Sequence, residues 1–497
     1  MLRDRELYDA LIALRNEIKH EGDETYRQWE VHIERQSYKE CALNLAYYLA
    51  LRRRDIRTIQ ASLSPYGLSS LGRSEAKTLE NLDAVIRSLG TILGEVKYDI
   101  TTVSEANFNE GAYNLQKNTA AVLGDIPAHR NTAIMVTLGR DVAFNEKELK
   151  RLFQAGMNLA RINCSHDDEQ TWYKMISNVR GVAAELGCPC RILMDVAGPK
   201  TRVKALYTTI QRPRVNVGDR IFLTGEEWLR PFYGADIVLQ SSIPDIIPML
   251  TLGAAVLIDD GMVETDVCGV YPEGVMLEVK HILRERSIRL RAEKGLNFPS
   301  SNQAFPILTE KDLRDLPFVA EHADIIALSF VRNASDIRQF QIHLADCIGP
   351  QKAREKAIVA KIETVEGANH LPEIIVTGAA KNPFGIMIAR GDLAVEAGYM
   401  RLSELQEQIL WLCEAAQVPV VWATEILSNL IKTGIPTRAE ITDAAMAGRS
   451  ECAMLNKGNY IVEGVTALDD ILTRMVEHQY KKTPRLRALS LAELREK

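Results

Sequence analysis

Several features that would assign the chain to a special class are missing from its sequence. No run of about eighteen apolar residues occurs, so no segment is expected to span a membrane as a helix. Basic residues form only short runs and the formal net charge is −6, so neither a nucleic acid nor an anionic membrane is an expected partner. Residues 1–22 mix acids and bases among the apolar positions, unlike a signal peptide.

Closely spaced cysteines are also scarce. The eight cysteines are scattered, and only Cys188 and Cys190 lie near each other, so we expect reduced thiols and a cytoplasmic location. What remains is an ordinary globular composition of 497 residues, 46% hydrophobic and 25% charged. This length accommodates about two to four domains.

The first quarter of the chain shows only the apolar pattern that is typical of helices. Apolar residues recur at a helical period in two segments, at Leu7, Leu11, Leu14 and Ile18, and at Leu79, Leu82, Ile86 and Leu89. No alternating β-branched run interrupts them, so residues 1–128 are predicted to form an all-helical domain. The run Arg52–Arg54 is interpreted either as a phosphate-binding patch or as a solvated helix face, and the second needs no special cause.

Short apolar runs alternate with amphipathic helical segments from about residue 130 onward. The eight runs span 133–138, 158–163, 191–196, 324–330, 357–363, 385–390, 418–423 and 452–456. Eight such β/α units predict a TIM barrel in the α/β class. A doubly wound open sheet is the competing interpretation, but no glycine-rich dinucleotide turn follows the first run.

One long segment breaks the alternation after the third strand. Residues 203–292 have period-two runs and an Asp260–Gly261 turn, which is typical of antiparallel hairpins. We therefore predict a β-rich lid domain at 203–292, inserted into a barrel formed by 129–202 and 293–475. Residues 476–497 are predicted to form a C-terminal tail.

Charged and polar residues gather where the predicted strands end, which is where active sites of TIM barrels lie. They are Arg161, Asn163, Ser165, His166, Asp195, Lys200, Arg202, Lys361, Glu363, Asp392 and Thr424. A structural salt bridge explains any single pair of these charges. The convergence of three cations and three carboxylates on one rim indicates a functional site instead.

The residue types at this rim indicate a class of chemistry. Glu363 and Asp392 follow adjacent strands and suit Mg²⁺, which takes one or two protein carboxylates and completes its shell with substrate oxygens. Cations beside such a metal favour phosphoryl transfer, and the Gly391–Asp392 turn that opens a helix offers N–H groups to an anion. The residues predict a metal-assisted enzyme acting on a small, highly anionic phosphorylated or carboxylated substrate.

The same strand ends carry a family resemblance. From about residue 130 to 475 the chain resembles pyruvate kinases in ten motifs that follow the family's order. The motifs are ARINCSH (160–166), MDVAGPKTR (194–202), VLIDDG (256–261), KGLNFP (294–299), LTEKDLRDL (308–316), ALSFVRNASD (327–336), AKIETVEG (360–367), IARGDLAVE (388–396), WATEIL (422–427) and PTRAEITD (436–443). The resemblance also implies a barrel with a mobile β lid after strand three.

The resemblance implies roles at the phosphoryl end of the site. Glu363 and Asp392 match the ligands of the divalent metal, Mg²⁺ or Mn²⁺, that bridges phosphoenolpyruvate. Lys361 matches the lysine that neutralises the phosphoryl group in flight and the enolate left behind. Arg161 matches the arginine that grips the phosphate. The implied reaction converts phosphoenolpyruvate and ADP to pyruvate and ATP, as in glycolysis.

The resemblance also implies roles for the remaining motif residues. Thr424 matches the threonine near the substrate carboxylate and on the proton path to the enolate carbon. Gly391 and Asp392 match the positions whose backbone amides bind that carboxylate. His166 and Arg202 lie where the family contacts its nucleotide.

One departure from the family's third-strand motif concerns the monovalent cation. Most members have a glutamate at the position of Lys200 and need K⁺, whereas the family's K⁺-independent members have lysine there, as this chain does. The Lys200 ammonium group would take the place and charge of K⁺ near Asn163, Ser165 and Asp195. K⁺ is therefore not expected to be required. The alternative is that Lys200 is a solvated loop lysine.

Other departures concern loops and length. The loop after the last strand, Leu455–Gly458, is about four residues shorter than in the family, and Gly139–Asp141 lacks the family's proline–alanine–serine turn. Few residues follow Met475, so we expect the C-terminal regulatory domain, its sugar-phosphate activation and its tetramer contacts to be missing. The motif at 436–443 belongs to the family's barrel–barrel contact, which leaves a homodimer possible.

Three functions follow from these observations. The leading one is a Mg²⁺-dependent, K⁺-independent pyruvate kinase that binds phosphoenolpyruvate and ADP or ATP. The second keeps the phosphoenolpyruvate and enolate site but uses another acceptor, because barrel loops change chemistry readily. The third is a non-catalytic phosphoenolpyruvate-binding regulator, against which the complete set of Lys361 and both metal carboxylates argues.

Overall fold

The computed structural model describes residues 4–69, 71–95, 100, 103–210, 213–283, 287–299 and 306–488. At its centre, eight parallel strands close into a barrel in chain order, and the last strand pairs with the first. They are β1 (Ala133–Thr137), β2 (Leu159–Asn163), β3 (Arg191–Val196), β13 (Ile325–Leu328), β14 (Ala357–Ile362), β15 (Phe384–Ala389), β16 (Val420–Ala423) and β17 (Cys452–Leu455). Seven of the eight predicted runs contain one of these strands, and the run 385–390 overlaps β15, which begins one residue earlier. The predicted fold class is therefore confirmed.

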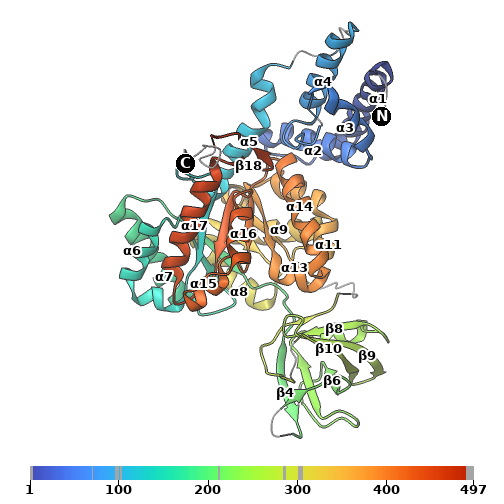
Figure 1. The fold of residues 1–497 in the computed structure, drawn as a ribbon. Coiled ribbons are helices and arrows are strands. Elements are labelled where there is room, and N and C mark those ends of the chain that lie inside the picture. The colour runs from blue at the N-terminus through green and yellow to red at the C-terminus, as the bar shows by residue number, and fades with distance from the viewer. Residues whose placement is uncertain are drawn as a thin grey trace, which may run out of the picture.

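Helices cover the outside of the barrel (Figure 1). They are α6 (Glu146–Ala155), α7 (Glu169–Leu186), α8 (Glu310–His322), α9 (Ala334–Ile348), α10 (Pro350–Glu355), α11 (Val365–Asn369), α12 (Leu371–Ala379), α13 (Arg390–Ala397), α14 (Tyr399–Ala415), α15 (Ser428–Thr433), α16 (Arg438–Ala447) and α17 (Ile461–Val476). Their starts follow local sequence signals: Thr309 and Thr437 each form a capping box with the acid three residues later. The strands are buried on both faces, which explains why they appear in the sequence as continuous apolar runs.

The segment after β3 forms a separate β sheet with its own apolar core. Its seven strands are β4 (Val203–Thr208), β6 (Arg220–Thr224), β7 (Ile237–Ser241), β8 (Ala255–Ile258), β9 (Val263–Tyr271), β10 (Gly274–Ile282) and β12 (Leu296–Asn297). A short pair, β5 (Arg214–Val215) and β11 (Ile288–Arg289), lies beside it. The predicted turn joins β8 to β9, where Asp260 and Gly261 have φ of 54° and 80°. This inserted sheet is the predicted lid.

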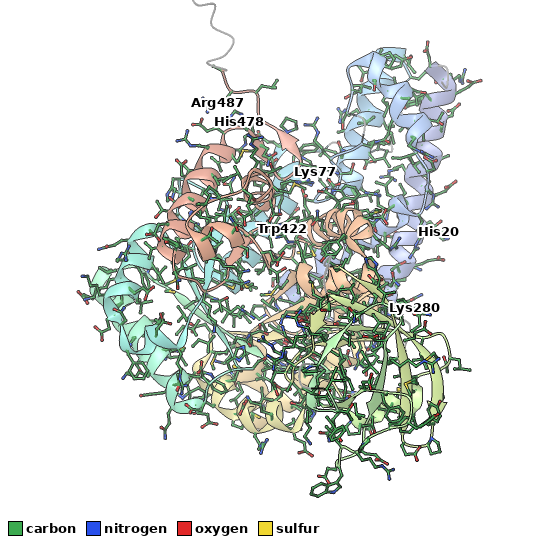
Figure 2. All side chains as sticks on the ribbon, turned by 60° about the horizontal axis from the view of Figure 1, so that its bottom comes forward. His20, Lys77, Lys280, Trp422, His478 and Arg487 are labelled. Atoms are coloured by element: carbon green, nitrogen blue, oxygen red, sulfur yellow. The ribbon has the colours of Figure 1, made fainter. Side chains whose placement is uncertain are left out.

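The N-terminal region is helical, as predicted. It contains α1 (Asp4–Glu30), α2 (Lys39–Arg52), α3 (Arg57–Leu63), α4 (Thr78–Leu93) and α5 (Glu105–Leu123). The last turn of α5 closes the barrel, because Val122 and Leu123 belong to the same buried cluster as Met135 and Leu193 of the strands. The helical region and the inserted sheet consequently lie at opposite ends of the barrel (Figure 1). In Figure 2, Trp422 of β16 lies among the barrel elements and Lys280 of β10 on the inserted sheet.

No helix in the described ranges combines the length and the apolar character that a bilayer crossing requires.

A small hairpin near the end of the described chain joins the barrel to the helical region. It consists of β18 (Gln479–Tyr480) and β19 (Thr483–Pro484), with two lysines between the strands. Lys481 is buried and pairs with Glu451, which precedes β17. Lys482 pairs with Glu75, which precedes α4. Two adjacent side chains therefore connect the hairpin to two different parts of the fold.

Replacing Lys481 by Met should destabilise the protein strongly. The change leaves the carboxylate of Glu451 buried without its cation, a loss that we place at about 3 kcal/mol. Chemical denaturation of the full chain measures it. Arg474→Ala is the matched control, because its pair with Asp470 is exposed to solvent and should contribute little to stability. Equal stability of the two variants would contradict this account of the hairpin.

Candidate active site

A small cavity opens among the C-terminal ends of the barrel strands, on the side of the inserted sheet. Its volume is about 140 Å³. It is lined by Arg161, Asn163, Ser165, Ala197, Lys200, Arg202, Ser329, Phe330, Lys361, Glu363, Met387, Ala389, Asp392, Thr424 and Met454. Nine of these are residues that the sequence singled out, and they come from strands far apart along the chain. We call this the strand-end cavity.

A buried carboxylate organises one wall of the cavity. Asp195, at 1% exposure, accepts a hydrogen bond from Nε of Arg161 at 3.0 Å and lies 3.2 Å from Nζ of Lys361. Ser329 donates to the same carboxylate at 3.1 Å and accepts from Lys361 at 2.8 Å. Thr137 accepts a further hydrogen bond from Arg161 at 3.0 Å. Both cations are thereby fixed in position.

The charge states of this cluster follow from its partners. Burial alone would raise the pKa of Asp195, but Lys361 and Arg161 hold it below its usual value. Burial would lower the pKa of Lys361, but Asp195 and Glu363 raise it above its usual value. At neutral pH the cluster therefore presents a carboxylate and two full positive charges. A site of this charge favours an anionic ligand.

Two carboxylates stand on the neighbouring strands. Glu363 follows β14, is 3% exposed, accepts a hydrogen bond from the Phe330 amide at 2.6 Å and lies 3.2 Å from Nζ of Lys361. Asp392 lies in the first turn of α13, directly after β15. The pKa of Glu363 is raised by burial and by the charges of Asp392 and Asp195. A bound cation would relieve this repulsion, so the pair fits a divalent metal.

The donor set of the pair restricts which metal it suits. Within the described ranges, no group of three or more histidine, cysteine or acidic side chains is arranged to hold a metal ion. Two carboxylates alone suit Mg²⁺ or Mn²⁺, which complete their shells with water or substrate oxygens. The strand-end cavity therefore lacks the ligands of a closed structural zinc site.

Lys200 contacts a different carboxylate from the one that the sequence suggested. Its Nζ lies 2.6 Å from Asp392 Oδ1 and 3.5 Å from Asp260 of the inserted sheet. Burial would lower the pKa of Lys200, but these two carboxylates raise it. The expected neighbours Asn163 and Ser165 line the same cavity, whereas Asp195 is already paired with Arg161 and Lys361. Lys200 is therefore a fixed cation of the site that bridges the barrel and the inserted sheet.

A strained turn after β16 places Thr424. Its φ is +65°, a left-handed conformation that is costly for a β-branched residue. The hydroxyl of Thr424 accepts a hydrogen bond from the Gly391 amide at 2.8 Å. Arg390 holds the turn by donating to the carbonyls of Ala423 and Thr424 at 2.9 and 2.6 Å. Asp443 in turn pairs with Arg390, so the guanidinium group is held both by the turn and by this carboxylate.

Of the two residues expected to contact nucleotide, Arg202 lines the strand-end cavity and His166 lies beside it. His166 lines an adjoining cavity of about 200 Å³ that shares Arg161 with it, and Lys457 lines that adjoining cavity as well. Arg202 lies where the chain enters the inserted sheet and donates to the Glu293 carbonyl at 3.1 Å. The structure thus brings both residues to the strand-end cavity or to the cavity that adjoins it.

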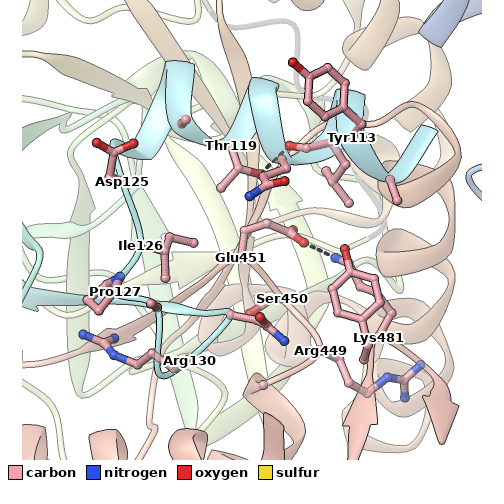
Figure 3. A pocket seen from close by; sticks show the side chains of 18 of the residues that line it. Tyr113, Thr119, Asp125, Ile126, Pro127, Arg130, Arg449, Ser450, Glu451 and Lys481 are labelled. Atoms are coloured by element: carbon pink, nitrogen blue, oxygen red, sulfur yellow. Dashed lines mark hydrogen bonds and ion pairs between the residues drawn. The ribbon is translucent and has the colours of Figure 1, made fainter. Parts of the chain in front are cut away.

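A larger cavity lies at the other end of the barrel and carries different chemistry. Figure 3 shows it between α5, residues 124–131, residues 448–451 and the C-terminal hairpin, with a volume of about 720 Å³. Its cations already have partners: Arg130 pairs with Asp469, Arg449 with Glu407 and Lys481 with Glu451. None of the strand-end residues lines it. The smaller strand-end cavity is therefore the candidate active site.

Two residues of the site had no role assigned from the sequence, although Arg390 stands at the end of a predicted strand. Ser329 connects Lys361 to Asp195, and Arg390 supports Thr424. The available signal was their position, because each follows a barrel strand directly. Gly198 shows a related constraint: with φ of +68°, it passes so close to Ser329 that an added Cβ would lie 2.8 Å from that side chain.

The fold and the site together define a class of protein. The chain is a TIM-barrel protein whose catalytic face holds two fixed cations around a buried aspartate and a carboxylate pair suited to a hard divalent metal.

Comparison with known proteins identifies the family. Residues 129–465 match the family model "Pyruvate kinase, barrel domain". The chain is 34% identical over 352 residues to the pyruvate kinase PKLR of Homo sapiens, covering 68% of this chain and 58% of that protein. It is 32% identical to the pyruvate kinase of Hypocrea jecorina, covering 68% and 61%, and 31% identical to that of Bacillus licheniformis, covering 70% and 57%. The chain belongs to the pyruvate kinase family, and the match spans about three fifths of these relatives' length.

Replacing Arg390 by Ala should loosen the turn that carries Thr424. The change removes the donors to the Ala423 and Thr424 carbonyls and leaves Asp443 without its cation. We expect the Gly391 amide, which bonds to Thr424, to exchange its hydrogen about tenfold faster. Hydrogen exchange measured on β13 amides is the internal control and should not change. An unchanged Gly391 rate would show that Arg390 does not hold the turn.

Proposed function

We propose that the protein is a pyruvate kinase that transfers the phosphoryl group of phosphoenolpyruvate to ADP and releases pyruvate and ATP. One observation carries the proposal: Arg161, Lys361, Glu363, Asp392 and Thr424 line a single cavity at the strand ends. These are the positions to which the family's motifs assign phosphate, metal and carboxylate binding. Membership of the family supports the same activity.

The metal of this reaction would be held by Glu363 and Asp392. When bound, Mg²⁺ or Mn²⁺ supplies positive charge to substrate oxygens. Arg161 binds the phosphate, and its orientation is fixed by Asp195 and Thr137. Catalysis of phosphoryl transfer consists mostly of positioning and charge neutralisation. The fixed orientation of Arg161 therefore contributes directly to catalysis.

Lys361 neutralises charge at both ends of the broken bond. The bond between the phosphorus and the enol oxygen breaks, a bond from phosphorus to a terminal ADP oxygen forms, and an enolate remains. The ammonium group of Lys361 lies between Asp195, Ser329 and Glu363, so it meets this enolate without reorganising. Thr424 lies on the path by which a proton reaches the enolate carbon, which completes pyruvate.

Replacing Lys361 by Met should abolish turnover while sparing the metal. We expect kcat to fall about a thousandfold, because the neutralising charge is lost in the transition state. Pyruvate formation coupled to lactate dehydrogenase measures this, and Mn²⁺ binding followed by electron paramagnetic resonance should persist through Glu363 and Asp392. Lys432→Met, at an exposed lysine of α15, is the control and should keep full activity. Wild-type turnover by Lys361→Met would reject the assignment.

We infer that the enzyme works without K⁺. The support is the place of Lys200, whose ammonium group lines the cavity with Asn163 and Ser165 and is held 2.6 Å from Asp392. A fixed positive charge is then part of the chain itself.

Wild-type activity in buffers free of Na⁺ and K⁺, with tetramethylammonium as the counter-ion, should therefore equal activity with added K⁺ within about twofold. Lys200→Glu removes the internal cation and should make turnover depend on K⁺. A wild-type enzyme that is inactive until K⁺ is added would contradict the inference.

A second candidate keeps the same site and changes the acceptor. The observation that favours it is a cavity of about 440 Å³ beside the nucleotide side, lined by Gly139, Asp141, Glu148, Lys457 and Gly458. It lies between the two loops that depart from the family. Screening pyruvate formation with other nucleoside diphosphates and with non-nucleotide acceptors separates this candidate from the ADP-specific enzyme.

We also propose the division into a helical domain (1–128), a barrel (129–202 with 293–475), a lid (203–292) and a tail (476–497). A homodimer through the barrel is supported by exposed apolar side chains at the motif 436–443, where Ile435 is 67% exposed and Ile441 39%. All eight cysteines, each within the described ranges, are free thiols, which supports a cytoplasmic location.

A further inference from the structure

The arginine run that the sequence left open, Arg52–Arg54, ends α2 where this helix lies beside α14 and the C-terminal hairpin (Figure 1). A cavity of about 470 Å³ opens there, far from the strand ends. It is lined by Tyr48, Leu51, Arg52, Arg54, Asp55, Ile56, Arg57, Gln60, Leu71, Gly72, Glu75 and Lys482. We call it the arginine cavity. Arg53, the middle residue of the run, does not line it.

Four cations and two carboxylates face the arginine cavity, and most of these charges are paired. Arg54 pairs with Glu17 and Glu21, which lie outside the cavity. Arg57 binds Asp55 through two nitrogens, at 2.9 and 2.6 Å.

Lys482 pairs with Glu75, which is 2% exposed. Arg52 is different, because within the described ranges no carboxylate lies at ion-pair distance from it.

Arg52 is nevertheless held in place. Its Nη1 donates a hydrogen bond to the hydroxyl of Tyr48 at 2.8 Å, and that hydroxyl donates to Glu75 at 3.1 Å. The guanidinium group also lies over the ring of Trp411 in α14, 4.8 Å from its centre, and Lys482 lies 4.9 Å from the same centre. Two cations are thus fixed around one indole ring, and Glu75 neutralises one of them.

Arg52 and Arg57 are exposed, so the fixed geometry of Arg52 is what distinguishes this cavity from an ordinary solvated helix face. A surface arginine without a partner samples many rotamers, whereas Arg52 is stacked and hydrogen-bonded with part of its fork of donors still open. The cavity volume lies in the range that encloses a small organic molecule rather than a single ion. Its open side carries Arg57, whose partner Asp55 is exposed and can be exchanged for another anion.

We propose that the arginine cavity is a binding site for a small phosphate-bearing anion. Arg52 and Arg57 bind the phosphate oxygens, since guanidinium groups match a phosphate in charge and in the spacing of their donors. Lys482 adds positive charge from the C-terminal hairpin. The site lies outside the strand-end cavity and does not depend on the proposed kinase activity.

Phenylglyoxal, which modifies accessible arginines, tests the site residue by residue on the full-length protein. Modification rates of Arg52, Arg53 and Arg57 are followed by peptide mass spectrometry with millimolar glycerol 3-phosphate, inorganic phosphate, or NaCl at matched ionic strength. We expect the phosphate compounds to slow the modification of Arg52 and Arg57 about fivefold or more. The modification rate of Arg53 should not change, so it is the internal control. If glycerol 3-phosphate protects more strongly than inorganic phosphate, the site is assigned to an organic phosphate. If the two compounds protect equally, the site is assigned to free phosphate.

A variant pair extends the test. In the Arg52→Gln variant, about tenfold more of the phosphate compound should be needed to protect Arg57 from modification. In the Arg53→Gln variant, Arg57 should be protected at the same concentration as in the wild-type protein. If all three arginines are protected equally, if none is protected, or if both variants behave alike, the proposal is overturned. The wild-type experiment decides the question even if a variant fails to fold.

Discussion

The candidate active site depends on one buried carboxylate. Asp195 holds Arg161 and Lys361 at once, and all three residues are at most 8% exposed. A buried aspartate without cations, or two buried cations without an aspartate, would be too costly to keep charged. Together they deliver two positive charges to the strand-end cavity in a fixed geometry. Neither Glu363 nor Asp392 is needed to balance the arginine, because Glu363 pairs with Lys361 and Asp392 pairs with Lys200.

The architecture allows such a charged cluster because the rest of the barrel is apolar and closed. The end of α5 fills the opposite mouth, where Val122 and Leu123 pack among strand residues. The hairpin lysines, bound to Glu451 and Glu75, attach the helical region to that same end. The inserted sheet reaches the catalytic end, where Lys200 touches both Asp260 of the sheet and Asp392 of the barrel. The helical region and the hairpin therefore cover one end of the barrel, and the inserted sheet reaches the other.

The barrel fold and many residues of the candidate active site could be predicted from the sequence. Strand order and strand ends follow from the alternation of apolar runs and helices, so nine of the fifteen residues that line the strand-end cavity could be named without a structure. Their pairing could not, because it depends on the stagger of the strands around the barrel. Lys200 was expected near Asp195 and lies against Asp392 instead. The contact of the C-terminal hairpin with Glu75 was equally inaccessible, since no local pattern links residues so far apart in the chain.

Following the reaction itself by ³¹P nuclear magnetic resonance tests the central claim most directly, with phosphoenolpyruvate, ADP and Mg²⁺ added to the wild-type protein in K⁺-free buffer. The account predicts that the phosphoenolpyruvate resonance disappears while the γ-phosphate resonance of ATP grows in equal amount. A phosphoenolpyruvate resonance that stays constant, or that is replaced by inorganic phosphate alone, would contradict it.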